Sequence, residues 1–421
     1  MLDSIGPAID HGPTKRLDKV PKWWVEILDT TATQMAVNFQ RQPEVEAELR
    51  NILGRLYFAL EKFDRAEAMF RGSLEIRRRI FRSPHPELVK TLYVEGKWKE
   101  CFAPLRESLA MSRTLYGNES PSAANALSIL GSAYYASSDS ASAEPYWREA
   151  LSICRKILAP NHPSVAESLE DLGWVPLWSD SREAESLFRE ALAIRRQSGT
   201  LDQLSVRRSP LEGIAMCRMR AGDFNEAERL ARESIDIDNR VPDCYPMILG
   251  YSYTVLGGIY SAQGNFAAAL PAWRRALDCF RHIDSTALVW GVIDSEYNVA
   301  ICLVNLGDPG SAEPLFRDAI DAWRNGFGDQ FYFTLRARNG LAAALVALGK
   351  YTEAETLLDG VWRVLETVDI PNGPKEIQPE TIQGKIDLYT AWAKTDPSKA
   401  PLAEQWRKRV GSPEKSPGAS P

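Results

Sequence analysis

The sequence feature that most constrains the fold is a short motif that returns about every 42 residues. Each copy contains a small residue, usually the Ala of an Ala-Glu step, which serves here as an anchor for aligning the copies. The anchors are Ala66, Cys101, Ala143, Ala184, Ala227, Ala269, Ala312 and Ala354, and they are spaced by 35, 42, 41, 43, 42, 43 and 42 residues. A unit of this length buries its apolar surface only against its neighbours, so the spacing predicts a repeat array.

Each copy predicts a pair of helices. The first helix carries apolar residues at helical spacing, as in Leu127, Leu130 and Tyr134, which is the pattern of one buried helix face. A turn follows, where glycine suits the left-handed conformation that closes a helix. Such turns contain Gly222, Gly264 and Gly349. The second helix begins near the anchor, which must be small because two helix backbones approach closely there. The pattern therefore predicts an all-α chain.

The motif consists of a Gly or Ala, a Tyr, a turn such as Gly-Lys-Tyr or Gly-Asn-Phe, and an Ala-Glu step. It resembles the tetratricopeptide repeat, and its 42-residue period resembles the kinesin-light-chain-like subclass. A weak further copy runs from Leu388 to Trp392 and continues at Ala403 and Glu404. The resemblance implies an all-α, right-handed α-solenoid of eight to nine tetratricopeptide-like helical hairpins. It also implies a non-catalytic scaffold or adaptor that binds a protein or peptide in a concave groove.

Two terminal segments resemble the repeat region of bacterial Ser/Thr protein kinases. One is Trp24–Asp29 with Gln42–Arg50, and the other is Leu388–Trp392 with Trp406. The chain shows no Gly-rich phosphate loop and no HRD or DFG motif, so a kinase domain is not expected in it. The alternative function is therefore the regulatory or sensing repeat region of such a signalling system, separated from its catalytic domain. The expected location is cytoplasmic, or facing the periplasm if the chain belongs to a membrane-anchored kinase.

The repeats also predict the domain organisation. We expect an N-terminal segment with a capping helix at 1–45, the solenoid at 46–368, a degenerate last repeat with a capping helix at 369–410, and a disordered tail at 411–421. The N-terminal helix should lie near Trp23 to Asn38, and the final helix should contain Trp406. Pro176 should end or kink a first helix. The short spacing before Cys101 predicts a short first helix between Pro86 and Gly96.

Composition excludes several classes of function. A net charge of -6 and a pI near 5.5 argue against nucleic acid as a partner. The six cysteines include no CxxC pair, and the four histidines lie near no triad or metal-ligand pattern, so we expect no catalytic residue, no metal site and no cofactor. Cys244–Trp273 lacks charge for 30 residues, but Pro246 and Pro271 interrupt it. We therefore expect a buried helical hairpin there rather than a membrane span.

In this family, the groove is lined by first-helix residues that are offset from the buried face. These offsets select Tyr135, Trp174, Trp178, Met216, Met219, Tyr251, Thr254, Tyr297, Ile301 and Val304. The set is aromatic, Met-rich and aliphatic, so it predicts a protein or peptide partner with apolar side chains. Glu167, Glu170 and Glu212 on the same side predict a basic rim on that partner. The alternative is that a tight superhelix buries these side chains against one another.

Arginine pairs recur in the second helices and suggest basic patches. They are Arg77 to Arg79, Arg195 with Arg196, and Arg274 with Arg275. Most lie late in a helix, where a cation complements the helix dipole, so we expect them to face solvent.

Overall fold

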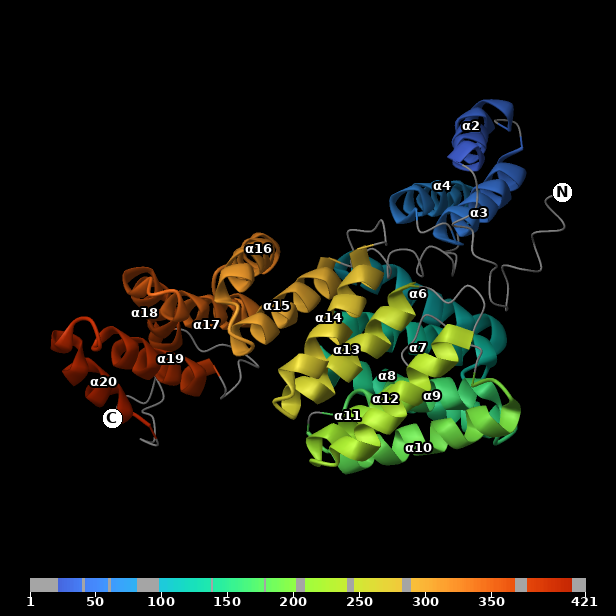
Figure 1. The fold of residues 1–421 in the computed structure, drawn as a ribbon. Helices are drawn as coiled ribbons and strands as arrows, with labels where there is room; N and C mark the ends of the chain where they lie inside the picture. The colour runs from blue at the N-terminus through green and yellow to red at the C-terminus, as the bar shows by residue number, and fades with distance from the viewer. Residues whose placement is uncertain are drawn as a thin grey trace, which may run out of the picture. The chain divides into compact units, whose positions relative to one another are not determined.

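The computed structural model describes residues 22–39, 42–59, 62–81, 98–137, 139–177, 179–201, 209–240, 246–281, 289–367 and 377–410. Within these ranges the chain forms eighteen α-helices, one short 3-10 helix and no strand (Figure 1). It divides into two compact units. Unit 1 holds Met1–Ile259 and Cys279–Val289, and unit 2 holds Tyr260–Asp278 and Trp290–Pro421. The predicted all-α fold is confirmed.

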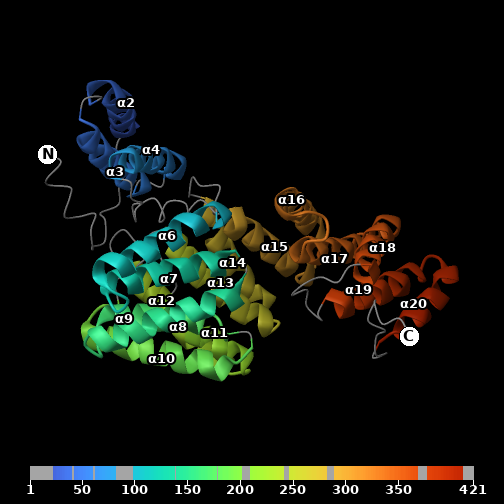
Figure 2. The same cartoon turned by 180° about the vertical axis from the view of Figure 1, so that it is seen from behind.

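The helices follow one another along the chain (Figures 1 and 2). The first ten are α2 (Lys22–Asn38), α3 (Pro43–Ala59), α4 (Phe63–Phe81), α6 (Trp98–Tyr116), α7 (Pro121–Ala136), α8 (Ser140–Ile157), α9 (Pro163–Gly173), α10 (Ser181–Ser198), α11 (Pro210–Arg220) and α12 (Phe224–Arg240). The rest are α13 (Pro246–Ala262), α14 (Phe266–Arg281), α15 (Val289–Asn305), α16 (Pro309–Phe327), α17 (Tyr332–Ala347), α18 (Tyr351–Thr367), α19 (Ile377–Trp392), η3 (Pro397–Lys399) and α20 (Ala400–Arg407). Within unit 1, α3 packs on α4, α7 on α8, α9 on α10 and α11 on α12; within unit 2, α17 packs on α18 and α19 on α20. Consecutive helices therefore form the predicted hairpins.

The turn glycines have the conformation that their position requires. Gly222, Gly264 and Gly349 have φ of 79, 70 and 73°, which is the left-handed region where a Cβ atom would be strained. Each turn lets the next helix start directly and reverse direction.

The anchor positions lie where the helices of a hairpin touch. The anchors Ala66, Ala143, Ala184, Ala227, Ala269, Ala312 and Ala354 are all 0% exposed. A large ring of the second helix also packs onto a first-helix glycine. A Cβ atom on Gly131 would lie 2.7 Å from the Trp147 ring, and one on Gly340 would lie 2.5 Å from the Phe316 ring. Corresponding rings of the second helices are buried in the core: Phe70, Trp147, Phe188, Trp273 and Phe316.

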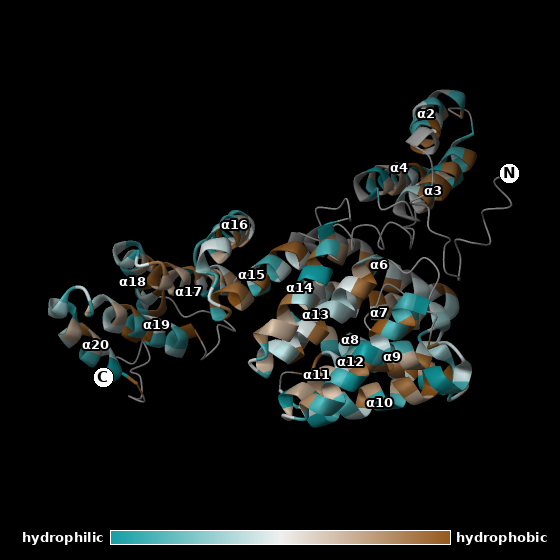
Figure 3. Cartoon of the chain, viewed as in Figure 1, coloured by the Kyte–Doolittle hydropathy of each residue, from teal (hydrophilic) through white to brown (hydrophobic). Residues whose placement is uncertain are grey.

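Hydrophobic and hydrophilic residues occur together on the same helices (Figure 3). This is the expected distribution for helices that bury one face and expose the other. None of the helices in the described ranges has the length and hydropathy that crossing a bilayer requires.

The ends of the array agree with several predictions. Helix α2 covers the predicted N-terminal helix, and α20 contains Trp406. Helix α9 ends at Gly173, before Pro176. The predicted short helix between Pro86 and Gly96 and the tail at 411–421 lie outside the described residues. The domain boundaries at 45, 368 and 410 stay predictions.

Candidate protein-binding surface

In unit 1, several predicted groove residues lie near the C-terminal ends of first helices. Tyr135 is the second-last residue of α7 and is 36% exposed, with its ring centroid 5.5 Å from that of Trp147. Met216 and Met219 lie one turn apart near the end of α11, and both are half-buried. We call Tyr135, Met216 and Met219 the end stripe of unit 1. They combine apolar surface with access to solvent.

The other predicted residues of unit 1 are more closely tied to the core. Trp174 is half-buried, and its ring meets Phe188 edge to face at 5.0 Å. Tyr251 in α13 meets Phe280 in the same way at 5.2 Å, and Thr254 donates a 2.6 Å hydrogen bond to the carbonyl oxygen of Tyr251. Trp178 lies outside the described residues.

In unit 2, the three predicted residues on α15 divide along the helix. Tyr297 is 6% exposed, and its ring lies 5.8 Å from Phe316 and 5.6 Å from Trp323. Burial raises the pKa of Tyr297 to about 12, so its hydroxyl stays protonated. Ile301 and Val304, farther along the same face, are half-buried and form the end stripe of unit 2. Tyr297 therefore fits the alternative in which these side chains are buried against one another. The residues nearer the C-terminal end of α15 reach solvent instead.

Two of the three glutamates that were expected to face a basic rim on the partner are buried instead. Glu170 is 2% exposed and forms an ion pair with Arg195, which is 6% exposed. Glu212 is 0% exposed and accepts a hydrogen bond from Ser252 of α13. Only Glu167 is half-exposed. The expectation that Arg195 faces solvent is wrong for the same reason, because α9 and α10 pack against each other at this pair.

A recurring series of ion pairs joins the second helices of neighbouring repeats, and one of these pairs involves Lys350, which directly precedes α18. In unit 1 the pairs are Arg113–Glu149, Arg148–Glu183, Arg155–Glu190 and Arg196–Glu233, and in unit 2 they are Arg317–Glu353 and Lys350–Glu313. We call this series the ion-pair ladder. Its partners lie 35 to 37 residues apart, which is close to one repeat.

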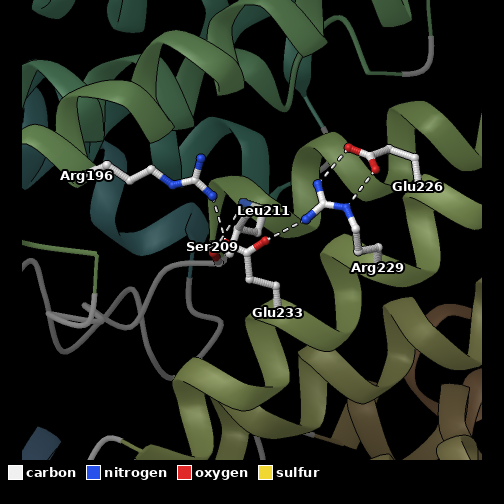
Figure 4. A network of polar contacts seen from close by, with 6 residues as sticks. All are labelled: Arg196, Ser209, Leu211, Glu226, Arg229 and Glu233. Atoms are coloured by element: carbon white, nitrogen blue, oxygen red, sulfur yellow. Dashed lines mark hydrogen bonds and ion pairs between the residues drawn. The ribbon is translucent and has the colours of Figure 1, made fainter.

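Figure 4 shows one rung of the ladder. Arg196 of α10 contacts Glu233 of α12 at 2.7 Å, and Glu233 also accepts from Arg229, which pairs with Glu226. Such exposed pairs contribute only about 0–1 kcal/mol each. They nevertheless give these cations a carboxylate partner within the chain, which weakens this face as a site for an acidic ligand.

One exposed apolar cluster was not predicted from the sequence. In unit 2, Trp290 at the start of α15 is 39% exposed and Phe327 at the end of α16 is 50% exposed, with ring centroids 4.6 Å apart. Phe331 and Phe333, which flank the start of α17, lie 5.6 and 5.9 Å from the Trp290 ring. The dense run of aromatic residues between Phe327 and Phe333 was the signal that could have revealed it. We call these four residues the aromatic link cluster.

The cysteine and histidine side chains of the described residues bear on metal binding and nucleophilic chemistry. No group of three or more His, Cys, Asp or Glu side chains in these ranges could hold a metal ion. Burial raises the pKa values of Cys217 and Cys302 to about 11, so both stay neutral thiols rather than nucleophilic thiolates. His162 accepts a hydrogen bond from the backbone nitrogen of Ser164 and caps α9.

Comparison with known families tests the resemblance. A family model described as "Tetratricopeptide repeat" matches residues 139–197, 207–282 and 292–359, and a second model of the same description matches residues 47–87. Together they cover more than half of the chain. The chain is a tetratricopeptide repeat protein. No curated protein matches its sequence.

Solved structures with the same fold are distant in sequence. A chain in a structure of the APC/C hetero-tetramer Cut9-Hcn1 is 12% identical. The match covers 85% of this tetratricopeptide repeat chain and 59% of that one, with a TM-score of 0.55. A Rap protein complexed with Competence and Sporulation Factor is 10% identical, with 87% and 97% covered and a TM-score of 0.51. The apo quorum sensor NprR from B. thuringiensis is 13% identical, with 87% and 98% covered and a TM-score of 0.50. At these identities the likeness concerns the fold alone.

Proposed function

We propose that this tetratricopeptide repeat protein is a non-catalytic scaffold or adaptor that binds a protein or peptide through the ends of its first helices. The observation that carries the proposal is the contrast between its two kinds of helix. The end stripes keep Tyr135, Met216, Met219, Ile301 and Val304 apolar and partly open to solvent. The second helices instead pair their charges with one another in the ion-pair ladder.

The chemistry of the end stripes favours a partner with apolar side chains. Methionine is unbranched and adaptable, so a Met pair such as Met216 and Met219 can fit side chains of different shape. An exposed aromatic ring such as Tyr135 supplies a large contact area for little loss of conformational freedom. Two of the similar structures are complexes by their own descriptions, Cut9-Hcn1 and the Rap protein with its factor, which supports a binding role for this fold.

A direct test begins with a pulldown in which the full chain captures its partner for identification by mass spectrometry. Affinity for that partner and thermal melting are then measured for the Met216→Gln, Met219→Gln double variant. We expect affinity to fall about tenfold or more, because central apolar anchors dominate binding energies. The melting temperature should hold, because both side chains are only half-buried.

Leu115→Gln provides the matched control, because Leu115 is 64% exposed at the end of α6 and lies outside the end stripes. It should bind as the native chain does. Full affinity in a well-folded Met double variant would contradict the proposal for unit 1. Loss of binding in Phe327→Ala instead would place the contact at the aromatic link cluster.

The alternative function is the regulatory or sensing repeat region of a bacterial Ser/Thr kinase signalling system. The resemblance of Trp24–Asp29 and Leu388–Trp392 to such regions favours it. The neighbouring upstream reading frame tests this alternative. A kinase domain with an anchor helix there would support it, and would favour a location facing the periplasm over the cytoplasm. An upstream frame unrelated to kinases would favour the general scaffold.

A further inference from the structure

Three polar side chains from three successive helices meet in the interior of unit 1. They are Glu212 of α11, Asp238 of α12 and Ser252 of α13, and each residue is 0% exposed. The Ser252 hydroxyl oxygen lies 2.5 Å from Glu212 Oε1 and 2.5 Å from Asp238 Oδ2. A second hydroxyl, that of Ser234, lies 3.5 Å from Ser252 Oγ. The two acids therefore share one serine as a hydrogen-bond partner.

The number of hydrogens at this contact fixes the protonation of the acids. A serine hydroxyl carries one hydrogen and can donate to only one carboxylate at a time. The second contact, at 2.5 Å, needs a hydrogen of its own, and only a protonated carboxyl group can supply it. We propose that Glu212, Ser252 and Asp238 form a buried hydrogen-bond chain that holds one titrating proton, and that this proton makes the packing of α11, α12 and α13 sensitive to pH.

Asp238 is the acid that carries the proton. Burial raises the pKa of its carboxyl group from 3.8 to about 6, and the hydrogen bond with Ser252 is the one opposing influence. Its second oxygen, Oδ1, is buried without a hydrogen-bond partner among the described residues. In this arrangement protonated Asp238 donates to Ser252 Oγ, and the Ser252 hydroxyl donates to Glu212.

The neighbouring helices bring few charges into this part of unit 1. Helix α13 contains no charged residue, and α11 carries Arg218 and Arg220 at its opposite end, where Arg218 pairs with Glu185 of α10. The buried Arg195 of α10 is held by Glu170. The other charged residues of α12 are exposed or half-buried: Glu226, Glu228, Arg229, Arg232, Glu233, Asp236 and Arg240. Helix α14 contributes the thiol Cys279, which faces Gly250 of α13.

None of these groups is among the causes of the shifted pKa of Asp238. Loss of the proton would thus leave a buried carboxylate beside a second acid, and no cation of the described residues is among the groups that shift the pKa of Asp238. Because α11 and α13 carry Met216, Met219, Tyr251 and Thr254, loosening their contact would also disturb the proposed binding surface, a consequence that rests on the proposed function. The expected effect of pH on the stability of the folded chain does not depend on the proposed function.

The direction of the pH effect follows from the two pKa values. Asp238 binds its proton more tightly in the folded chain, at about 6, than in the unfolded chain, at 3.8. The stabilisation is therefore complete below about pH 4, is lost as the pH rises through about 6, and is constant above about 7. A difference of about two pKa units corresponds to about a hundredfold change in the unfolding equilibrium constant.

The test is urea unfolding of the full chain between about pH 4 and about pH 7, for the native sequence, Asp238→Asn and Asp236→Asn. The amide of Asn can donate to Ser252 Oγ at every pH. The unfolding equilibrium constant of Asp238→Asn should therefore lack the hundredfold change with pH that Asp238 contributes. Asp236 is exposed on the same helix, and Asp236→Asn should keep the native profile. Identical pH profiles for the native chain and Asp238→Asn would overturn the proposal.

Infrared spectroscopy provides a second measurement. At about pH 5 the folded native chain should show more absorption from protonated carboxyl groups than folded Asp238→Asn, and this difference should be absent above about pH 7. Asp236→Asn should lie much closer to the native chain at about pH 5, because an exposed aspartate is almost fully ionised there. Equal protonated-carboxyl absorption in the native chain and in folded Asp238→Asn at about pH 5 would also overturn the proposal.

Discussion

The guanidinium group of Arg195 and the carboxylate of Glu170 form a two-pronged ion pair that is buried between α10 and α9. Arg195 Nη2 donates to Glu170 Oε2 at 2.7 Å, and Nε donates to Oε1. The side chains are only 7% and 2% exposed. Arg195 Nη1 also donates to the carbonyl oxygen of Thr200 at 3.5 Å, so the pair joins a first helix, a second helix and the loop that follows.

Removing the charge of Glu170 should destabilise unit 1 strongly. Glu170→Gln keeps the shape of the side chain but removes the carboxylate charge that lies against the buried guanidinium of Arg195, and breaking a buried ion pair in this way typically costs about 3–5 kcal/mol. Urea unfolding measures the loss. The control is Glu233→Gln, which breaks the exposed pair with Arg196 and should cost about 1 kcal/mol or less. Equal losses in the two variants would show that burial does not set the strength of the Arg195 pair.

Gly340→Ala should destabilise unit 2, although alanine is the better helix former. The added Cβ atom would lie 2.5 Å from Phe316 Cε1, and Phe316 is 0% exposed and cannot withdraw easily. Overpacking of this kind costs about 1–3 kcal/mol, which exceeds the gain of about 0.5–1 kcal/mol in helix propensity. Gly360→Ala, in α18 of the same unit, meets no atom within 4 Å and should be neutral or stabilising. Thermal melting of both variants decides the matter, and a Gly340→Ala chain that melts higher than the native one would contradict the packing argument.

Ala269→Arg should strongly destabilise the repeat that contains it. Ala269 is 0% exposed, so the long charged side chain would be forced between packed helices at a cost of more than about 3 kcal/mol. Ala312→Arg should behave in the same way, because Ala312 is also 0% exposed. Ala267→Arg is the control, because Ala267 is exposed in the same helix.

Hydrogen exchange distinguishes a local effect of these substitutions from a global one. In a repeat array each hairpin contacts mainly its neighbours, so exchange should rise first in the altered hairpin. Native exchange rates and melting in Ala269→Arg would refute the role of the anchor.

The sequence alone determined the helical hairpins, their order and most of their core. The 42-residue period, the turn glycines and the small anchors are local signals, because helix periodicity and backbone conformation depend on residues that are close in the chain. That is why Ala269, Ala312 and Gly264 have the predicted burial or conformation.

Only the tertiary structure decided which polar residues of the first helices turn inward. A helical offset identifies the face on which Glu170 or Glu212 lies, but it does not tell whether another helix covers that face. Burial of Glu170 depends on Arg195, 25 residues later, and that of Glu212 depends on Ser252, 40 residues later. The same reason places Tyr297 in the core while Ile301 and Val304 on the same helix face reach solvent. Exposure is a property of the stacked repeats, because the neighbouring repeat supplies the atoms that displace water.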